Sequence, residues 1–117
     1  IGGLSSSANR NSTLVATASF EHKLSEITTV SVDSLGLDSA DYIKYDVEGA
    51  EKEALIGSRQ TILTHRPHLL VSIYHRSEDL FALPLQVHKI APHYSGFYLR
   101  RMAGVPAWDI NLYAVKE

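Results

Sequence analysis

Two short apolar segments with a helical pattern between them constrain the fold of this chain more than any other feature. Residues 42–47 follow a polar turn, and residues 69–74 follow Pro67, which does not continue a helix. Between them, residues 48–65 place apolar side chains at helical spacings, with Gly57 as a break between two helical pieces. The pattern predicts a βαβ unit in which both strands are buried and parallel.

The amino-terminal part of the chain has a weaker pattern. Residues 1–13 are mostly Gly, Ser, Asn and Arg, which predicts a loop or a frayed end. Residues 13–18 and 27–32 are rich in Val, Ile and Thr, and each suits a strand. We therefore expect residues 1–26 to form a loop with one possible strand, and residues 27–117 to form the main domain.

The carboxyl-terminal part extends the sheet. Residues 77–91 predict a helical region, which we expect to be interrupted at Pro84 and ended by Pro92. Residues 97–102 and 108–115 flank a short linker that suits a hairpin, so the sheet is predicted to end with an antiparallel strand. This order of elements indicates an α/β fold, half of a doubly wound sheet with a closing hairpin.

Composition excludes several classes of protein. A chain of 117 residues can bury a real core as one domain, and it contains no Cys, which excludes a disulfide scaffold, a zinc ribbon, an iron–sulfur centre and a thiol nucleophile. The net charge of −2 and the sequence pI of about 6.3 argue against a nucleic-acid partner. No apolar run approaches the roughly 18 residues of a membrane span. We expect a soluble, cytoplasmic protein.

Charged residues stand at the end of the first buried strand. Strand alternation places Lys44, Asp46 and Glu48 on one face, which is unusual for a buried strand. The carboxyl ends of parallel strands are where open α/β sheets bind their ligands, so Asp46 is the first candidate for a site residue. The alternative is structural: Lys44 and Asp46 form an ion pair, while Glu48 interacts with the positive end of the following helix.

His75 ends the second buried strand and is expected to reach the same edge as Asp46. An imidazole can take a proton from a hydroxyl group, and a carboxylate can orient the imidazole or contact a positively charged cofactor. His75 could equally be a hydrogen-bonded edge residue. Asp46, Glu48 and His75 could together hold a divalent cation and serve a metal-dependent hydrolase, but three scattered candidates are a weak signal, and no zinc spacing is present. We assign no metal at this stage.

Several sequence motifs of enzymes are absent. The chain contains no G-x-S-x-G nucleophile elbow, no G-x-x-x-x-G-K-[ST] phosphate loop and no glycine-rich turn after a predicted strand. Hydrolysis by a Ser–His pair and binding of a nucleoside triphosphate both lose support.

Residues 41–51, with the sequence DYIKYDVEGAE, closely resemble the strand-to-helix signature of FkbM-type methyltransferases. Further segments are similar to patterns of the same family, namely residues 32–35, 54–57, 66–69, 72–75, 78–80, 98–100 and 112–114. Ser34 departs from the family, which more usually has Leu beside the Asp. The resemblance covers about residues 27–117 and implies part of a Rossmann-like class I methyltransferase sheet.

The resemblance also implies a function. FkbM-type enzymes use S-adenosylmethionine and usually transfer its methyl group to an oxygen of a sugar or another small molecule. Such transfer requires the protein to align the acceptor and to help remove its proton. Asp46, His75 and Glu48 are then the expected catalytic residues, and Asp46 also the expected cofactor contact.

The family's first βα unit has no counterpart in this sequence. Its loop of the acidic-Gly-Ala-Asn type and the acidic ribose contact on the next strand would supply most of the cofactor contacts. We therefore expect the carboxyl half of the enzyme, inactive in isolation, whose partner is the missing amino-terminal half. An exposed sheet edge would then favour self-association. The rival interpretation is a non-catalytic α/β remnant or interaction module.

Overall fold

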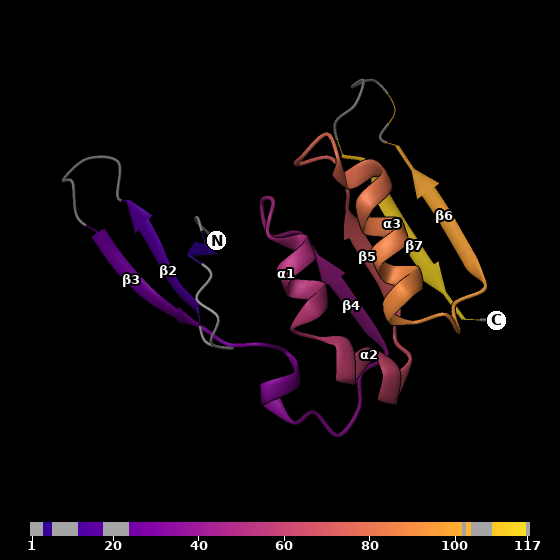
Figure 1. The fold of residues 1–117 in the computed structure, drawn as a ribbon, viewed down its shortest axis with the longest axis horizontal. Coiled ribbons are helices and arrows are strands. Elements are labelled where there is room, and N and C mark those ends of the chain that lie inside the picture. Colours follow the sequence, from indigo (N-terminus) through magenta and orange to yellow (C-terminus); the bar gives the residue numbers. More distant parts are fainter. Residues whose placement is uncertain (1–3, 6–11, 18–23, 102, 104–108, 117) are drawn as a thin grey trace.

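The computed structural model describes residues 4–5, 12–17, 24–101, 103 and 109–116 of the chain. Its strands form two sheets, one of three strands near the amino terminus and one of four strands in the remainder. Figure 1 shows the three-stranded sheet standing to one side of the four-stranded sheet and its helices. The candidate site residues all belong to the larger unit.

The three-stranded sheet consists of β1 (Leu4–Ser5), β2 (Ser12–Thr17) and β3 (Leu24–Thr29), which pair antiparallel in that order. The strand predicted at 13–18 is confirmed with a shift of one residue. The prediction of a loop throughout residues 1–13 is wrong for the described residues of that range. These residues form strands although several are polar, because strand pairing depends on backbone hydrogen bonds.

The strand predicted at 27–32 begins and ends three residues earlier than expected. Residues 33–35 form a short 3-10 helix, η1 (Asp33–Leu35), which ends at Gly36 in a left-handed conformation with a φ of 58°. The pairing of β3 with β2 determines where β3 begins and ends. The Val and Ile content of the segment therefore predicted the strand but not its limits.

The four-stranded sheet has the order β4-β5-β7-β6, with β4 (Tyr42–Tyr45), β5 (His68–Ser72), β6 (Gly96–Arg100) and β7 (Asn111–Val115). β4 and β5 are parallel, and β7 is antiparallel to both β5 and β6. The α/β fold and the closing antiparallel hairpin are confirmed: the edge strand β6 pairs antiparallel with β7, although β7, the later strand in the chain, lies inside the sheet. Leu112 and Ala114 are fully buried, which places β7 inside the sheet and β6 at its edge.

Three helices pack against the four-stranded sheet: α1 (Glu51–Ile56), α2 (Arg59–His65) and α3 (Asp79–Ile90). Figure 1 shows α1 and α3 in front of its strands. The predicted break at Gly57 separates α1 from α2. The core between helices and sheet contains the buried side chains of Tyr45, Leu55, Ile62, Leu69, Val71, Ile73, Leu83, Val87, Ile90, Ala91, Tyr94, Leu112 and Ala114. No helix in the described ranges is long and apolar enough to cross a membrane.

The predicted interruption at Pro84 is wrong, because α3 continues through it. Proline removes one helical hydrogen bond and costs about 3 kcal/mol in a helix interior. Leu83, Val87 and Ile90 lie on one side of α3 and are buried in the core. Their burial, at roughly 1.5 to 3 kcal/mol for each side chain, offsets the cost of the proline.

The prediction that both parallel strands are buried holds for β5 but not for β4. Tyr42 and Lys44 are exposed, while Tyr45 is only 3% exposed. β4 pairs with β5 alone, and no strand covers its other edge within the described residues. β4 is therefore an edge strand whose carboxyl end opens to solvent.

Candidate active site

The chain makes a tight left-handed turn where β4 ends. Asp46 follows the strand directly, and Glu48 and Gly49 both have positive φ values, of 54° and 99°. A Cβ atom at Gly49 would lie 3.3 Å from Nε of Arg76, so a side chain there would be strained and crowded. Glu48 has no such freedom, and a non-glycine residue held in this region often marks a functional site.

The structure brings Asp46, Glu48 and His75 together at the carboxyl ends of β4 and β5. Nε2 of His75 lies 3.6 Å from Oδ1 of Asp46 and 3.6 Å from Oε2 of Glu48. The His75 side chain is only 9% exposed, whereas Asp46 and Glu48 are 37% and 69% exposed. The three residues form a rim with a buried imidazole and two solvent-facing carboxylates. Their catalytic roles remain predictions.

Lys44 takes part in this arrangement on its outer side. Its Nζ lies 3.5 Å from Oδ2 of Asp46, and both side chains are exposed. The ion pair anticipated as the structural alternative is therefore present. It occupies one oxygen of Asp46, while the other oxygen faces His75.

Glu51 is a site residue that sequence reasoning missed. Its side chain is fully buried, its Oε1 accepts a hydrogen bond of 3.0 Å from the Val47 backbone N–H, and the same oxygen lies 2.6 Å from Nδ1 of His75. Glu51 begins α1 four residues before the buried Leu55. This i, i+4 spacing on a covered helix face was the available signal.

Two buried atoms of the site have no hydrogen-bond partner. Among the described residues, the buried side-chain atoms without a partner are Oε2 of Glu51, Nε2 of His75 and Nε2 of His93. Nε2 of His75 belongs to the rim, and Glu51 contacts Nδ1 of the same imidazole ring. Because nearly all buried polar groups in proteins are paired, unpaired atoms concentrated at one place indicate a site prepared for a ligand or a proton.

Tyr74 adds a hydroxyl group near the same carboxylates. Burial raises its pKa first, followed by the negative charges of Asp46, Asp109, Glu48 and Glu51. The Tyr74 ring also contacts that of His75, with the ring centroids 4.2 Å apart. Tyr74 is thus a neutral hydrogen-bond donor at pH 7 beside an acidic rim.

Asp109 is held near this edge by residues of the neighbouring strands. It has a φ of 54°, and its Oδ1 accepts a hydrogen bond of 2.9 Å from Nδ2 of Asn111. The Ser72 hydroxyl donates to Oδ1 of Asn111 at 3.2 Å. Sequence reasoning missed this group because Asn111 and Ser72 meet only through the pairing of β7 with β5.

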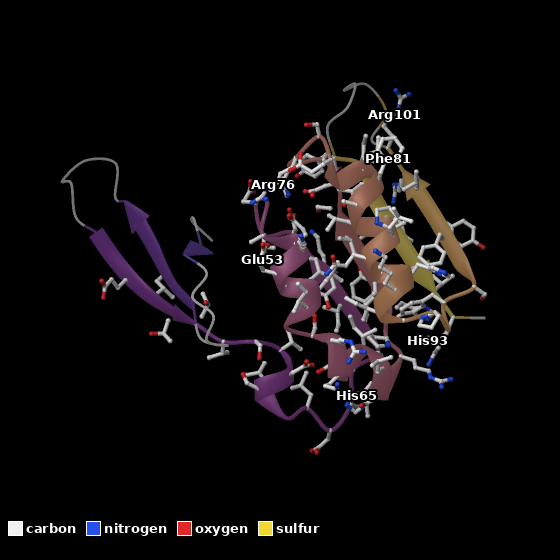
Figure 2. The ribbon with its side chains drawn as sticks, viewed as in Figure 1. Glu53, His65, Arg76, Phe81, His93 and Arg101 are labelled. Carbon is white, nitrogen blue, oxygen red and sulfur yellow. The ribbon has the colours of Figure 1, made fainter. Side chains whose placement is uncertain are left out.

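The other histidines that the structure describes take no part in the rim. His65 contacts the Leu37 carbonyl oxygen at 2.9 Å, His68 begins β5 at the opposite end, and the ring of His88 packs near Phe97. Within the described residues, the group that could hold a metal ion consists of Asp46, Glu48 and His75. Figure 2 shows the labelled His65 and His93 at the end of the molecule away from Arg76, which follows His75 in the chain.

Comparison with known proteins identifies the family to which the chain is similar. Residues 2–97 match the model of the methyltransferase FkbM domain. The chain is also similar to the crystal structure of a methyltransferase FkbM from Methylobacillus flagellatus KT, at 35% identity and a TM-score of 0.69 over 86% of this chain. No protein of curated function matched.

The chain belongs to the FkbM methyltransferase family, which confirms the resemblance drawn from residues 41–51. The family match begins at residue 2, so it includes the amino-terminal segment that the resemblance had left out. The chain spans 25% of the length of the Methylobacillus structure.

Proposed function

We propose that this chain forms part of an S-adenosylmethionine-dependent methyltransferase that methylates a hydroxyl oxygen of a sugar or another small molecule. Membership of the FkbM methyltransferase family supports methyl transfer. The observation that supports the location of the chemistry is the rim, where one buried imidazole nitrogen lies 3.6 Å from each of two carboxylates.

The residues at the rim fit the charge of the proposed methyl donor. The donor supplies an electrophilic methyl group on a positively charged sulfonium. Asp46, Glu48 and Asp109 provide negative charge around Tyr74, and Asp46 is accessible to solvent. We assign Asp46 as the residue that contacts the donor, because a carboxylate stabilises a nearby cation.

His75 is suited to remove the acceptor proton. Glu51 accepts a hydrogen bond from Nδ1 and fixes the tautomer in which Nε2 has a free lone pair. That lone pair takes the hydroxyl proton while the acceptor oxygen forms its new bond to the methyl carbon and the carbon–sulfur bond breaks. Asp46 and Glu48, each 3.6 Å from Nε2, then stabilise the imidazolium that results.

A methyl-transfer assay tests the proposal. The protein encoded by the complete reading frame that contains these residues is incubated with methyl-labelled S-adenosylmethionine and a panel of sugars and small-molecule alcohols. We expect labelled ethers from the wild type, loss of turnover in Asp46→Asn, and normal turnover in Asp38→Asn, a matched change in an exposed carboxylate before β4. Unchanged turnover in Asp46→Asn would remove Asp46 from the mechanism.

The alternative function is a non-catalytic α/β module that uses the sheet for packing or partner contact. The observation in its favour is that the described residues include the acidic rim but no glycine-rich loop after a strand. We expect the 117-residue chain alone to bind S-adenosylmethionine weakly or not at all. Micromolar affinity in a calorimetric titration would contradict that expectation, and absence of methyl transfer by the complete protein would favour the module.

A further inference from the structure

We propose that Nε2 of His75 and the carboxylates of Asp46 and Glu48 form a binding site for one divalent transition-metal ion. The three donor atoms lie within 4.8 Å of one another. Metal binding by the rim goes beyond the proposed methyl transfer, and it differs from our sequence analysis, which assigned no metal.

The distances suit a shared ion better than direct contacts. Nε2 of His75 is 3.6 Å from one oxygen of Asp46 and 3.6 Å from one oxygen of Glu48, beyond ordinary hydrogen-bond length. Two donors that each lie about 2.1 Å from one ion are about 3.4 Å apart in a tetrahedral site. The oxygens of the two exposed carboxylates lie within 4.8 Å of each other and would move toward the ion on coordination.

The buried imidazole is the second, independent observation that indicates a ligand. The His75 side chain is 9% exposed, its Nε2 has no hydrogen-bond partner, and this atom faces both carboxylates. An unprotonated Nε2 has a lone pair that faces two negative groups, an arrangement that a cation between them stabilises.

Glu51 completes the arrangement of a typical metal-binding histidine. Such histidines usually donate the other ring N–H to a carboxylate or a carbonyl oxygen, which fixes the ring and raises its basicity. Nδ1 of His75 lies 2.6 Å from Oε1 of the fully buried Glu51. The Val47 N–H holds the same oxygen at 3.0 Å, so the imidazole is oriented before an ion arrives.

The charge of the rim also favours a cation. Asp46, Glu48 and Glu51 surround one imidazole, and among the described residues only Lys44 and His75 lie within ion-pair distance of these carboxylates. Lys44 contacts the outer oxygen of Asp46 and leaves the inner oxygens facing His75. A divalent ion would offset this excess of negative charge.

The donor set indicates the class of metal. One imidazole nitrogen with two carboxylates is a mixed set that suits Mn²⁺, Fe²⁺ or Zn²⁺, whereas Mg²⁺ and Ca²⁺ prefer oxygen donors alone. Three protein donors leave positions open for water or substrate. If the proposed function holds, an acceptor hydroxyl bound to the ion would lose its proton more readily, because a bound cation acts as a Lewis acid. Nε2 of His75 is then a metal ligand, so the proton passes to water or to a carboxylate oxygen rather than to the imidazole.

Binding of Mn²⁺ to the 117-residue chain, without any methyl donor, tests the site. The loss of the free Mn²⁺ signal in electron paramagnetic resonance measures binding, and pulsed spectra report a nitrogen ligand. We expect one saturable site with a ¹⁴N coupling, and at least about a 10-fold loss of affinity in Glu48→Gln and His75→Asn. Asn at position 75 retains a donor toward Glu51 but offers no nitrogen lone pair to the ion.

Matched variants distinguish a specific Mn²⁺ site from nonspecific attraction of Mn²⁺ to acidic groups. Glu48 is 69% exposed, so Glu48→Gln is expected to leave the fold intact. Asp38→Asn, which removes an exposed carboxylate elsewhere, is expected to keep wild-type affinity. The absence of saturation up to about 1 mM Mn²⁺, the absence of a ¹⁴N coupling, or equal affinity in all variants would overturn the site. None of these outcomes bears on methyl transfer, which the labelled-methyl assay decides.

Discussion

The two ends of the β4–β5 pair are built from similar residue types but differ in how their polar groups are satisfied. At the amino end, the Tyr94 hydroxyl donates to the Pro67 carbonyl oxygen, and the His68 N–H donates to the Asp41 carbonyl oxygen at 2.8 Å. At the carboxyl end, Glu51 and His75 each leave a buried atom without a partner. The amino end therefore contributes stability, while the carboxyl end retains unused binding capacity.

Backbone conformation differs less between the two ends, because Arg66, which precedes β5, also has a positive φ, of 51°. Glu48 and Asp109, both at the carboxyl edge, have φ values of 54°, in a region that costs a non-glycine residue about 1 to 3 kcal/mol. Between the end of β4 and the start of α2, the hydroxyl groups of Tyr45 and Ser58 lie 2.6 Å apart in a buried hydrogen bond. Among the described residues, two of the three unpaired buried atoms and two of the three non-glycine residues with positive φ lie at the carboxyl end; the others are Nε2 of His93 and Arg66.

The largest expected effect is on chemistry, at the carboxyl end. In the complete protein, His75→Asn is expected to lower kcat/KM for methyl transfer by about 10²- to 10⁴-fold, because the proton acceptor of the metal-free site, or a ligand of the metal-bound site, is lost. The variant keeps a donor for Glu51, so we expect a melting temperature close to that of the wild type. A variant that melts normally and retains full activity would contradict the assigned role.

The next effect is on stability, at the amino end. Tyr94→Phe removes the hydroxyl that donates to the buried Pro67 carbonyl oxygen. An unsatisfied buried acceptor costs about 1 to 3 kcal/mol, so the free energy of unfolding in a urea titration should fall by that amount. Affinity for Mn²⁺ should not change. If Tyr94→Phe instead weakened Mn²⁺ binding and left stability normal, the amino end would not be the stabilising end and the proposed difference between the two ends would be wrong.

A smaller loss of stability is expected from Asp33→Ala. The Asp33 carboxylate accepts hydrogen bonds from the backbone N–H groups of Gln60 and Thr61, at 3.0 and 2.8 Å, and so caps α2 from a distant segment. Loss of a cap costs about 1 kcal/mol. Denaturant unfolding of this variant should show a lower midpoint with the same slope, and an unchanged midpoint would show that water replaces the cap.

The smallest effect concerns pH. Burial, followed by the charges of Arg66 and Lys116, lowers the pKa of His93 below its ordinary value of 6.5. The unfolded chain therefore takes up a proton at this residue before the folded chain does, and stability falls as pH drops through and below 6.5. Unfolding at pH 7.5 and pH 5.5 should show a smaller acid loss in His93→Gln than in the wild type, and an equal loss would exclude His93 as a source.

Local patterns predicted much of the fold. The βαβ unit, the break at Gly57 and the final hairpin follow from spacing and from glycine or proline signals within a few residues. The position of β7 between β5 and β6 did not follow, because it depends on pairing between strands separated by about 40 residues. Pro84 was misread for a related reason, since burial of Leu83 and Val87 in the core outweighs its local effect.

The site was predictable only in part. Asp46 and His75 follow from the rule that parallel strands deliver ligand-binding residues at their carboxyl ends. Glu51 was missed although its i, i+4 spacing from Leu55 was a signal, because a glutamate in the first turn of a helix is usually exposed and its partner His75 is 24 residues away in the chain. Tyr74 and Asp109 required the tertiary structure for the same reason.

The most direct test is a crystal structure of the complete protein with S-adenosylhomocysteine and Mn²⁺. The predicted result is an anomalous Mn²⁺ peak bonded to His75 Nε2, Asp46 and Glu48, with the sulfur of the ligand beside this rim. A ligand bound instead in the groove between α1 and α3, which Lys52, Gln86 and Lys89 help to line, with only water at the rim, would contradict the account.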